Sequence, residues 1–382
     1  MGKTVQRSSG VMSERKTIVI SAVNLRKGGT LTILRDCLQY LSELVHEGKY
    51  RVVALVHKRE LCDYDGIEYI EMPDIIKGWG KRLWCEYVTM KRISKELSPV
   101  YLWLSLHDTS PRVEAERQAV YCQTSFPFYK WSVRDFKMDF KIPLFAMFTK
   151  YAYRLNIRSN RYLIVQQNWL REGFSRMFGL EIDRFIVAPP PRKSVEVVAE
   201  MIDKKVYTFF YASTPDCHKN FETLCEASRL LEEEIGQGKF KVVLTLSGKE
   251  NKYSRWLYEK WGHLHSIDFS GFMSKEMLYG YYKAADCMVF PSKVETWGLP
   301  ITEFLVVSGD KPMLLSNLPY AHETASGASK VSFFNPADPT ELKNRMKELI
   351  QDNCVSLAPV LKRNVEEPKA YTWKALFEIL LG

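Results

Sequence analysis

Two glutamates, Glu295 and Glu303, are the residues of this sequence whose type and spacing best suit chemistry. They stand eight positions apart, with Gly298 and Pro300 between them. Carboxylates accept hydrogen bonds from hydroxyl groups, and the unpaired N–H groups of a helix N-terminus bind anions. A glycine at that terminus allows a ligand to approach the backbone closely. The pattern therefore predicts a site for a ligand with phosphates at its centre and hydroxyls at both ends, such as a nucleotide sugar.

The elements around the glutamates are expected to bring both acids to one helix N-terminus. Residues 287–290 form an apolar run typical of a buried strand, and 301–307 are typical of a helix. Pro300 suits the first helical turn, where a missing N–H costs nothing. Glu295 then lies in the loop before the helix, and Glu303 lies about one turn inside it. The alternative is that Glu303 only complements the helix dipole and that Glu295 is a solvated loop acid.

The longer string that holds both glutamates carries a family resemblance. It reads Val-Phe-Pro-Ser-x2-Glu-Thr-Trp-Gly-Leu-Pro-x2-Glu and runs from Val289 to Glu303. It resembles the retaining glycosyltransferases of family four, of the bacterial surface-polysaccharide type, which have the two-domain GT-B fold. The resemblance implies that Glu295 contacts hydroxyls of the donor sugar and that Glu303 contacts the ribose hydroxyls. The donor-binding residues that it implies are Gly28, Gly29, Lys219, Gly298, Leu299, Pro300, Ile301 and Glu303.

Lys219 is, beside Glu295, the second residue to which the resemblance assigns a catalytic role. Its ammonium and the helix N–H groups of residues 298–301 would stabilise the negative charge that develops on the leaving diphosphate. Family members usually carry an arginine five residues before this lysine, where the present chain has Thr214. The sequence therefore leaves open which basic residue replaces that arginine.

The sequence does not indicate a metal or a separate cofactor. Asp63 and Asp65 match the D-x-D metal motif of the other large glycosyltransferase fold, but they stand in a polar Asp-Gly turn typical of a protein surface. No spacing of metal ligands is apparent elsewhere. A metal-independent reaction is therefore expected, with the nucleoside-diphosphate sugar as a substrate.

The first half of the chain supplies three candidate contacts to ligands. Gly28 and Gly29 form a glycine turn after a strand-like run, without the G-x-G-x-x-G spacing of a dinucleotide site. The resemblance implies that this turn approaches the donor phosphate and the acceptor. His107 and Gln123 follow two further strand-like runs, and the carboxyl ends of parallel strands bind ligands in open sheets. Related sequences commonly have a histidine at the position of Gln123. Both residues are candidates for the acceptor site.

Composition bounds the class of protein. At 382 residues, with 46% apolar and 26% charged residues, the chain is expected to form two globular domains. It has no run of eighteen apolar residues, and its polar N-terminus lacks the apolar core of a signal peptide. Its eight cysteines show no C-x-x-C spacing. We therefore expect a reduced, cytoplasmic protein with buried thiols.

Strand-like runs alternate with helical sequence along the whole chain, which predicts an α/β fold with parallel sheets. The fold class is two doubly wound, Rossmann-like parallel-sheet domains that face a cleft, the GT-B fold. The predicted strands are 17–23, 51–56, 67–70, 100–105, 119–122, 162–165 and 184–188, then 206–211, 241–246, 266–269, 287–290, 312–315 and 331–334. The expected divisions are a polar extension 1–16, an acceptor-side domain 17–190, a donor domain 191–370, and a helix 371–382 that crosses back to the first domain.

The net charge of +9 is concentrated in part in residues 130–161, which contain eight Lys or Arg against two Asp, mixed with aromatic residues. Such a segment suits an amphipathic helix on anionic lipid. It also suits a helix that packs its aromatic side chains into the first domain and keeps its lysines in water. Nucleic acid is not expected as a partner, because no known nucleic-acid motif accompanies the charge.

The predicted function is that of a hexosyltransferase-type glycosyltransferase, which moves a sugar from a nucleoside-diphosphate sugar to a saccharide acceptor with retention. A lipid-linked acceptor in surface polysaccharide or lipopolysaccharide synthesis would fit a protein that is peripheral on the inner face of the membrane. Two alternatives stay open. One is a nucleotide-sugar epimerase of the same fold, and the other is a non-enzymatic, basic, membrane-peripheral binding protein.

Overall fold

The first sheet of the protein has seven parallel strands. The structure is a computed structural model and describes residues 15–190 and 206–382. The strands follow the order β3-β2-β1-β4-β5-β6-β7. Their bounds are β1 (Lys16–Ala22), β2 (Tyr50–Val56), β3 (Ile67–Glu71), β4 (Val100–Ser105), β5 (Arg117–Tyr121), β6 (Tyr162–Val165) and β7 (Phe185–Val187). β4 is buried at every position, as its unbroken apolar run predicts for a central parallel strand.

The second sheet has six parallel strands in the order β10-β9-β8-β11-β12-β13. Their bounds are β8 (Tyr207–Tyr211), β9 (Phe240–Leu244), β10 (Ile267–Phe269), β11 (Cys287–Phe290), β12 (Met313–Ser316) and β13 (Val331–Phe334). Each sheet starts at an inner strand, β1 or β8, and the chain then adds strands on both sides of it. This winding, with helices between the strands, confirms the predicted fold class of two doubly wound domains.

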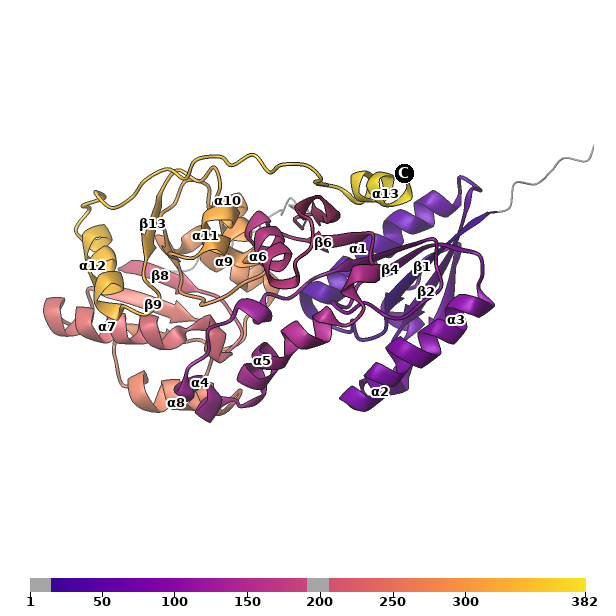
Figure 1. The fold of residues 1–382 in the computed structure, drawn as a ribbon. Coiled ribbons are helices and arrows are strands. Elements are labelled where there is room, and N and C mark those ends of the chain that lie inside the picture. Colours follow the sequence, from indigo (N-terminus) through magenta and orange to yellow (C-terminus); the bar gives the residue numbers. More distant parts are fainter. Residues whose placement is uncertain (1–14, 191–205) are drawn as a thin grey trace, which may run out of the picture.

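Helices connect the strands in both halves, and the two sheets lie side by side (Figure 1). The helices of the first half are α1 (Gly28–Val45), α2 (Trp79–Trp84), α3 (Met90–Glu96), α4 (Val133–Met138), α5 (Lys141–Arg154) and α6 (Asn168–Phe178). Those of the second half are α7 (Phe221–Ile235), α8 (Lys252–Trp261), α9 (Lys275–Ala284), α10 (Leu299–Ser308), α11 (Pro319–Thr324), α12 (Pro339–Ile350) and α13 (Trp373–Leu381).

The last helix, α13, belongs in space to the first sheet. The C-terminal chain, yellow in Figure 1, runs along the second half and ends against α1. Phe377 of α13 stacks on Tyr40 of α1 with ring centroids 5.5 Å apart. The hydroxyl of Tyr101, at the start of β4, donates to the carbonyl of Leu381 at 2.7 Å. These contacts join the chain's end to its first domain. The expected boundary at 190/191 and most of the extension 1–16 lie outside the described residues.

The segment 130–161 does not pack as one unit. Its first helix, α4, contacts the second half, where Arg134 pairs with Glu222 of α7 at 2.8 Å. Its second helix, α5, buries one face and exposes aromatic side chains on the other, with Phe148 and Tyr151 59% and 58% exposed. The core-packing interpretation therefore describes the buried face of α5, and lipid binding by its exposed face stays a prediction. Within the described residues, no helix combines the length and the apolar character that crossing a membrane requires.

Candidate active site

The loop between β11 and α10 places the two glutamates. β11 ends at Phe290 in the core, and α10 begins directly after Gly298, whose φ of +85° is in the left-handed region that favours glycine. A Cβ at Gly298 would lie 3.3 Å from Ile301 Cδ1, so the close turn also leaves little space for a side chain. Pro300 stands in the first turn, as predicted. Glu295 thus lies in the loop and Glu303 in the second turn of the helix.

Both glutamates line one cleft of about 550 Å³ between the two domains, which we call the glutamate cleft. Its lining consists of Gly29, Thr30, Thr32, Ile33, Asp36, Gln123, Gln166, Pro190, Lys219, Lys275, Tyr279, Glu295, Leu299, Thr302, Glu303 and Val306. The structure therefore brings together six predicted site residues that are up to 274 positions apart: Gly29, Gln123, Lys219, Leu299, Glu295 and Glu303.

Glu295 and Lys219 form an ion pair in the cleft, with Nζ and Oε1 2.7 Å apart. Lys219 follows β8 and Glu295 follows β11, which pairs with β8 in the sheet. The hydroxyl of Tyr211 joins the two loops, because it lies 2.8 Å from the carbonyl of Lys219 and 3.1 Å from Ser292 Oγ. The two side chains are only 16% and 13% exposed. The hydrogen bonds of Tyr211 thus fix the two loops that carry Lys219 and Glu295.

Glu303 has a different environment from Glu295. Its carboxylate faces the hydroxyl of Tyr279 at 3.5 Å, and Lys275 adds a nearby positive charge. Burial raises the pKa of Glu303 above its ordinary value, and Lys275 and Tyr279 only partly oppose this rise. No salt bridge within the described residues neutralises it. This acid is therefore kept half-buried and available to a ligand.

The N-terminus of α10 offers fewer N–H groups than residues 298–301 imply. Pro300 has no N–H, and the N–H of Ile301 donates to the carbonyl of Gly298 at 3.0 Å. Gly298 and Leu299 are left as the residues whose N–H groups can face an anion. Pro300 therefore cannot contribute an N–H group, and a contact between the Ile301 N–H and a ligand stays a prediction.

The first domain meets this helix terminus through its glycine turn and through Gln123. A Cβ at Gly29 would lie 3.9 Å from Leu299 Cδ1, while Gly28 is exposed and is not part of the cleft lining. Thr296 Oγ1 donates to the carbonyl of Gln123 at 3.0 Å. The side-chain Nε2 of Gln123 donates to the carbonyl of Leu106 at 2.6 Å, and no group in residues 15–190 or 206–382 bonds to its buried Oε1.

A comparison with known protein families finds a match in the second half of the chain. Residues 194–367 match the protein family described as "Glycosyl transferases group 1". This match covers less than half of the chain, and we call the described part of these residues the group 1 domain. No curated protein sequence matches the chain.

Solved structures share the fold of the whole chain. Sucrose-phosphate synthase from Thermosynechococcus elongatus has a TM-score of 0.59 at 16% identity and covers 90% of this chain and 91% of its own. The lipopolysaccharide outer core galactosyltransferase WaaB has a TM-score of 0.58 at 12% identity, over 89% and 91%. Anabaena HepE in complex with UDP-glucose has a TM-score of 0.56 at 12% identity, over 89% and 92%. At these identities the likeness concerns the fold.

His107 is placed away from the lining of the glutamate cleft. Its ring is buried in the first domain, with Nε2 3.1 Å from Ser21 Oγ and Nδ1 3.0 Å from Thr109 Oγ1. Burial lowers its pKa to about 4, although Glu86 opposes this shift. The hydroxyls of Ser21 in β1 and of Thr109 in the loop after β4 hold the neutral ring, so contact with an acceptor would require the ring to leave its pocket.

Lys275 and Tyr279 of the group 1 domain line the cleft but were not predicted from the sequence. Both lie in the first turns of α9, a helix that no motif connects with the glutamates. Thr214, at the position of the usual arginine, bonds to Asp216 at 2.7 Å and does not line the cleft. Among the described residues of the lining, Lys275 is the second cation beside Lys219. In the described residues, no group of His, Cys, Asp and Glu side chains has the arrangement of a metal site.

Proposed function

We propose that this chain is a glycosyltransferase that moves a sugar, of the hexosyl type, from a nucleoside-diphosphate sugar to a saccharide acceptor. The observation that carries the proposal is the glutamate cleft, in which Glu295, Lys219 and Glu303 meet beside the N-terminus of α10. The group 1 domain and the UDP-glucose complex of the similarly folded HepE support a nucleotide sugar as donor.

The roles of the residues follow from the charges of the reaction. Cleavage of the sugar–phosphate bond leaves negative charge on the diphosphate and positive charge at the anomeric carbon. Lys219 and the N–H groups of Gly298 and Leu299 would stabilise the diphosphate, and Lys275 would serve as the second cation. Glu303 would bind the ribose hydroxyls and Glu295 the hydroxyls of the transferred sugar. Retention and independence of metal are proposed from the family resemblance.

Gln123 is the proposed contact to the transferred sugar or the acceptor on the first domain's side. Gln123 lines the glutamate cleft, and its buried Oε1 has no hydrogen-bond partner among the described residues. A buried acceptor without a donor is costly, and a sugar hydroxyl would satisfy it. His107 stays a weaker candidate, because it is 1% exposed in this conformation.

A membrane-peripheral location with a lipid-linked acceptor is the second part of the proposal. The exposed face of α5 carries Phe148 and Tyr151 beside Lys141, Lys150 and Arg154, which are also exposed. Aromatic and basic side chains on one face suit an anionic lipid surface. WaaB, which is similar in fold, is a lipopolysaccharide galactosyltransferase.

Thermal unfolding with a panel of nucleoside-diphosphate sugars tests the donor. We expect one nucleotide to raise Tm in the presence of EDTA, since a ligand at a hundred times its Kd adds about 2.7 kcal/mol of stability. Lys219→Met should abolish most of the shift. A panel without any shift, or transfer that EDTA abolishes and manganese restores, would contradict the donor or the metal-independent reaction. An epimerised donor without transfer to any acceptor would favour the epimerase.

Vesicle sedimentation tests the membrane part separately. Phosphatidylserine vesicles should bind the protein, and salt should weaken this binding. Lys141→Glu with Lys150→Glu should weaken it by at least about tenfold, because each basic residue near the surface contributes about 1 kcal/mol. Lys374→Glu, an exposed change on α13, is the matched control. Binding that is absent or insensitive to salt would leave core packing as the role of this segment.

A further inference from the structure

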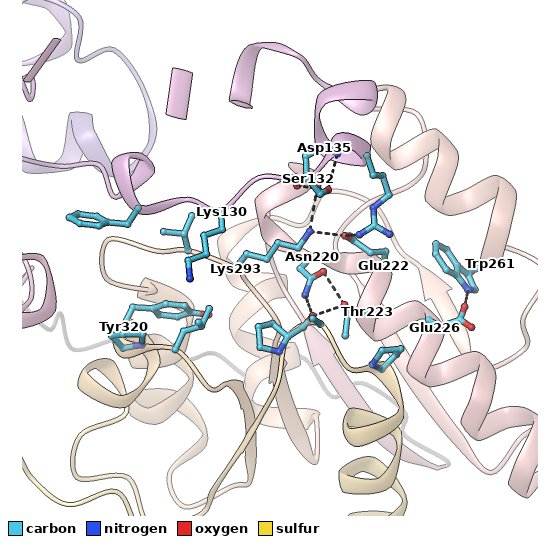
Figure 2. A pocket seen from close by; sticks show the side chains of 18 of the residues that line it. Lys130, Ser132, Asp135, Asn220, Glu222, Thr223, Glu226, Trp261, Lys293 and Tyr320 are labelled. Atoms are coloured by element: carbon cyan, nitrogen blue, oxygen red, sulfur yellow. Dashed lines mark hydrogen bonds and ion pairs between the residues drawn. The ribbon is translucent and has the colours of Figure 1, made fainter. Parts of the chain in front are cut away.

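A second interdomain pocket, of about 860 Å³, lies on the other side of the loop that carries Glu295 (Figure 2). Lys293 and Val294 line this pocket, whereas the next residue, Glu295, lines the glutamate cleft. The same alternation holds after β8, where Lys219 lines the cleft and Asn220 lines the pocket. The segments after β8 and β11 thus separate this pocket from the glutamate cleft.

One wall of this pocket is a closed network of charges. Lys293 Nζ lies 2.9 Å from Glu222 and 3.5 Å from Asp135 of α4, and Arg134 pairs with Glu222 at 2.8 Å. The hydroxyl of Tyr253 also donates to Glu222. Figure 2 shows the side chains of Lys293, Asp135 and Glu222 pointing toward one another. Their charges are balanced within the protein, so a ligand would gain little by separating them.

The neutral polar groups of the lining are also bonded within the protein. Asn220 Nδ2 donates to the carbonyls of Pro291 and Pro336 at 2.9 and 2.8 Å. Thr223 Oγ1 donates to the carbonyl of Pro336 at 2.9 Å, and the hydroxyl of Tyr320 donates to the backbone carbonyl of Ser292 at 2.8 Å. A saccharide in this pocket would find few partners for its hydroxyls, and unpaired buried hydroxyls are costly. The lining therefore disfavours a sugar.

What the pocket does offer is aromatic surface and the ammonium groups of Lys130 and Lys260. Phe128 and Trp169 meet edge to face with centroids 5.2 Å apart, and Tyr320 also lines the pocket. Lys260 lies over the ring of Trp261, with Nζ 4.3 Å from the ring centroid, whereas Lys130 points its ammonium toward Tyr320 (Figure 2). Within the part of the chain that the structure describes, no hydrogen bond or ion pair engages the ammonium of Lys130. Pockets of this size with apolar walls and a small number of placed charges are typical of small-molecule sites.

We propose that this pocket binds a small aromatic anion, whose ring lies between Phe128, Trp169 and Tyr320 and whose anionic group meets the ammonium of Lys130. The ligand is distinct from the donor in chemistry and in place. Because Lys293 and Val294 contact it from the loop that holds Glu295, its occupancy is linked to the conformation of that loop.

Fluorescence titration with anilinonaphthalene sulfonate, an aromatic anion, tests the site, with the neutral phenylnaphthylamine as the matched probe. Lys130→Met should weaken the anionic probe by about tenfold, as expected for one charge-assisted contact, and leave the neutral probe unchanged. Ala337→Trp adds bulk at an exposed position of the lining and should block both probes. Neither residue packs in the core, and equal Tm values would verify folding.

Two controls exclude other places of binding. Lys141→Met, on the exposed face of α5, should leave both probes unchanged, and UDP should not displace either of them. Unaltered binding of the anionic probe in both pocket variants, or its stoichiometric displacement by UDP, would overturn the proposal. Displacement of the probe by an aryl phosphate, an aryl carboxylate or both would support it and distinguish the anionic group.

Discussion

The two walls of the glutamate cleft are built differently, although both come from sheets of the same winding. Both lysines and both glutamates of the lining belong to the second domain, whereas the first domain contributes one charged side chain, Asp36. The charged residues Lys219, Glu295 and Glu303 of the second wall are positioned by the ends of the adjacent strands β8 and β11 and by the N-terminus of α10. Apart from Asp36, the first wall consists of uncharged residues, namely Gly29, Thr30, Thr32, Ile33, Gln123, Gln166 and Pro190. The difference suggests that the second wall performs the chemistry on the donor and that the first wall receives the acceptor.

The largest effect is expected for Glu295→Gln on the second wall. The substitution keeps the shape and removes the charge that would stabilise the sugar as its ring flattens. Because this contact strengthens in the transition state, kcat should fall on the order of a hundredfold while UDP still binds. Steady-state kinetics and a UDP titration measure the two effects. Glu259→Gln, an exposed acid of α8, is the control. Near-normal turnover would remove the main support for placing the donor sugar at this wall.

Glu303→Gln should affect donor binding instead of turnover. A carboxylate that accepts hydrogen bonds from ribose hydroxyls contributes roughly 1.5–3 kcal/mol, and it does so equally in the ground and transition states. The donor KM should therefore rise by about ten- to a hundredfold with kcat nearly unchanged. A fall in kcat without a rise in the donor KM would mean that Glu303 acts on the reacting sugar. The two glutamates would then have each other's proposed roles.

Most of the second wall could be predicted from the sequence, because its residues stand in one short string whose strand and helix are local. Glu295, Gly298 and Glu303 lie within nine residues, and the predicted strand and helix around them are confirmed. All thirteen predicted strands are present, since buried parallel strands are continuous apolar runs. Lys275 escaped prediction because only the fold brings α9 to the cleft. The bond from the Ile301 amide to the Gly298 carbonyl could not be predicted, because sequence does not show how the first turn closes.

The first domain was harder to read from the sequence. His107 follows a strand, as a site residue should, but its ring turns into the domain between Ser21 and Thr109. Between α2 and α3 the helical stretch contains a π-helical turn, Cys85–Thr89. This turn buries Glu86, which pairs with Arg82 at 2.9 Å. Periodicity cannot reveal a single inserted residue or the direction of one side chain, because both depend on distant partners.

Gln123→Ala tests the first wall and should have a smaller effect than either glutamate. A neutral hydrogen bond to a hydroxyl contributes about 0.5–1.5 kcal/mol to binding. Without it, the acceptor KM should rise by about two- to tenfold. The donor KM should stay within about twofold, because the donor lies on the other wall. Bisubstrate kinetics separates the two constants. An equal rise in both would indicate that Gln123 binds the transferred sugar.

The smallest expected effect is on the free energy of unfolding, which the buried carboxylate of Glu303 lowers at neutral pH. Burial raises the pKa of Glu303, so the folded protein binds this proton more tightly than the unfolded chain. The free energy of unfolding must then fall as the pH rises from the ordinary pKa of a glutamate, about 4.3, through the raised value. Glu303→Gln does not titrate and avoids this loss. Without donor, its Tm should match the wild type near pH 4 and exceed it at pH 8, by an amount on the order of a few degrees. Glu259→Gln should show no such pH-dependent gain. A variant that is less stable than the wild type at pH 8 would mean that the Glu303 carboxylate stabilises the fold. Glu303 would then have a structural role, and the argument that it is kept free for a ligand would fail.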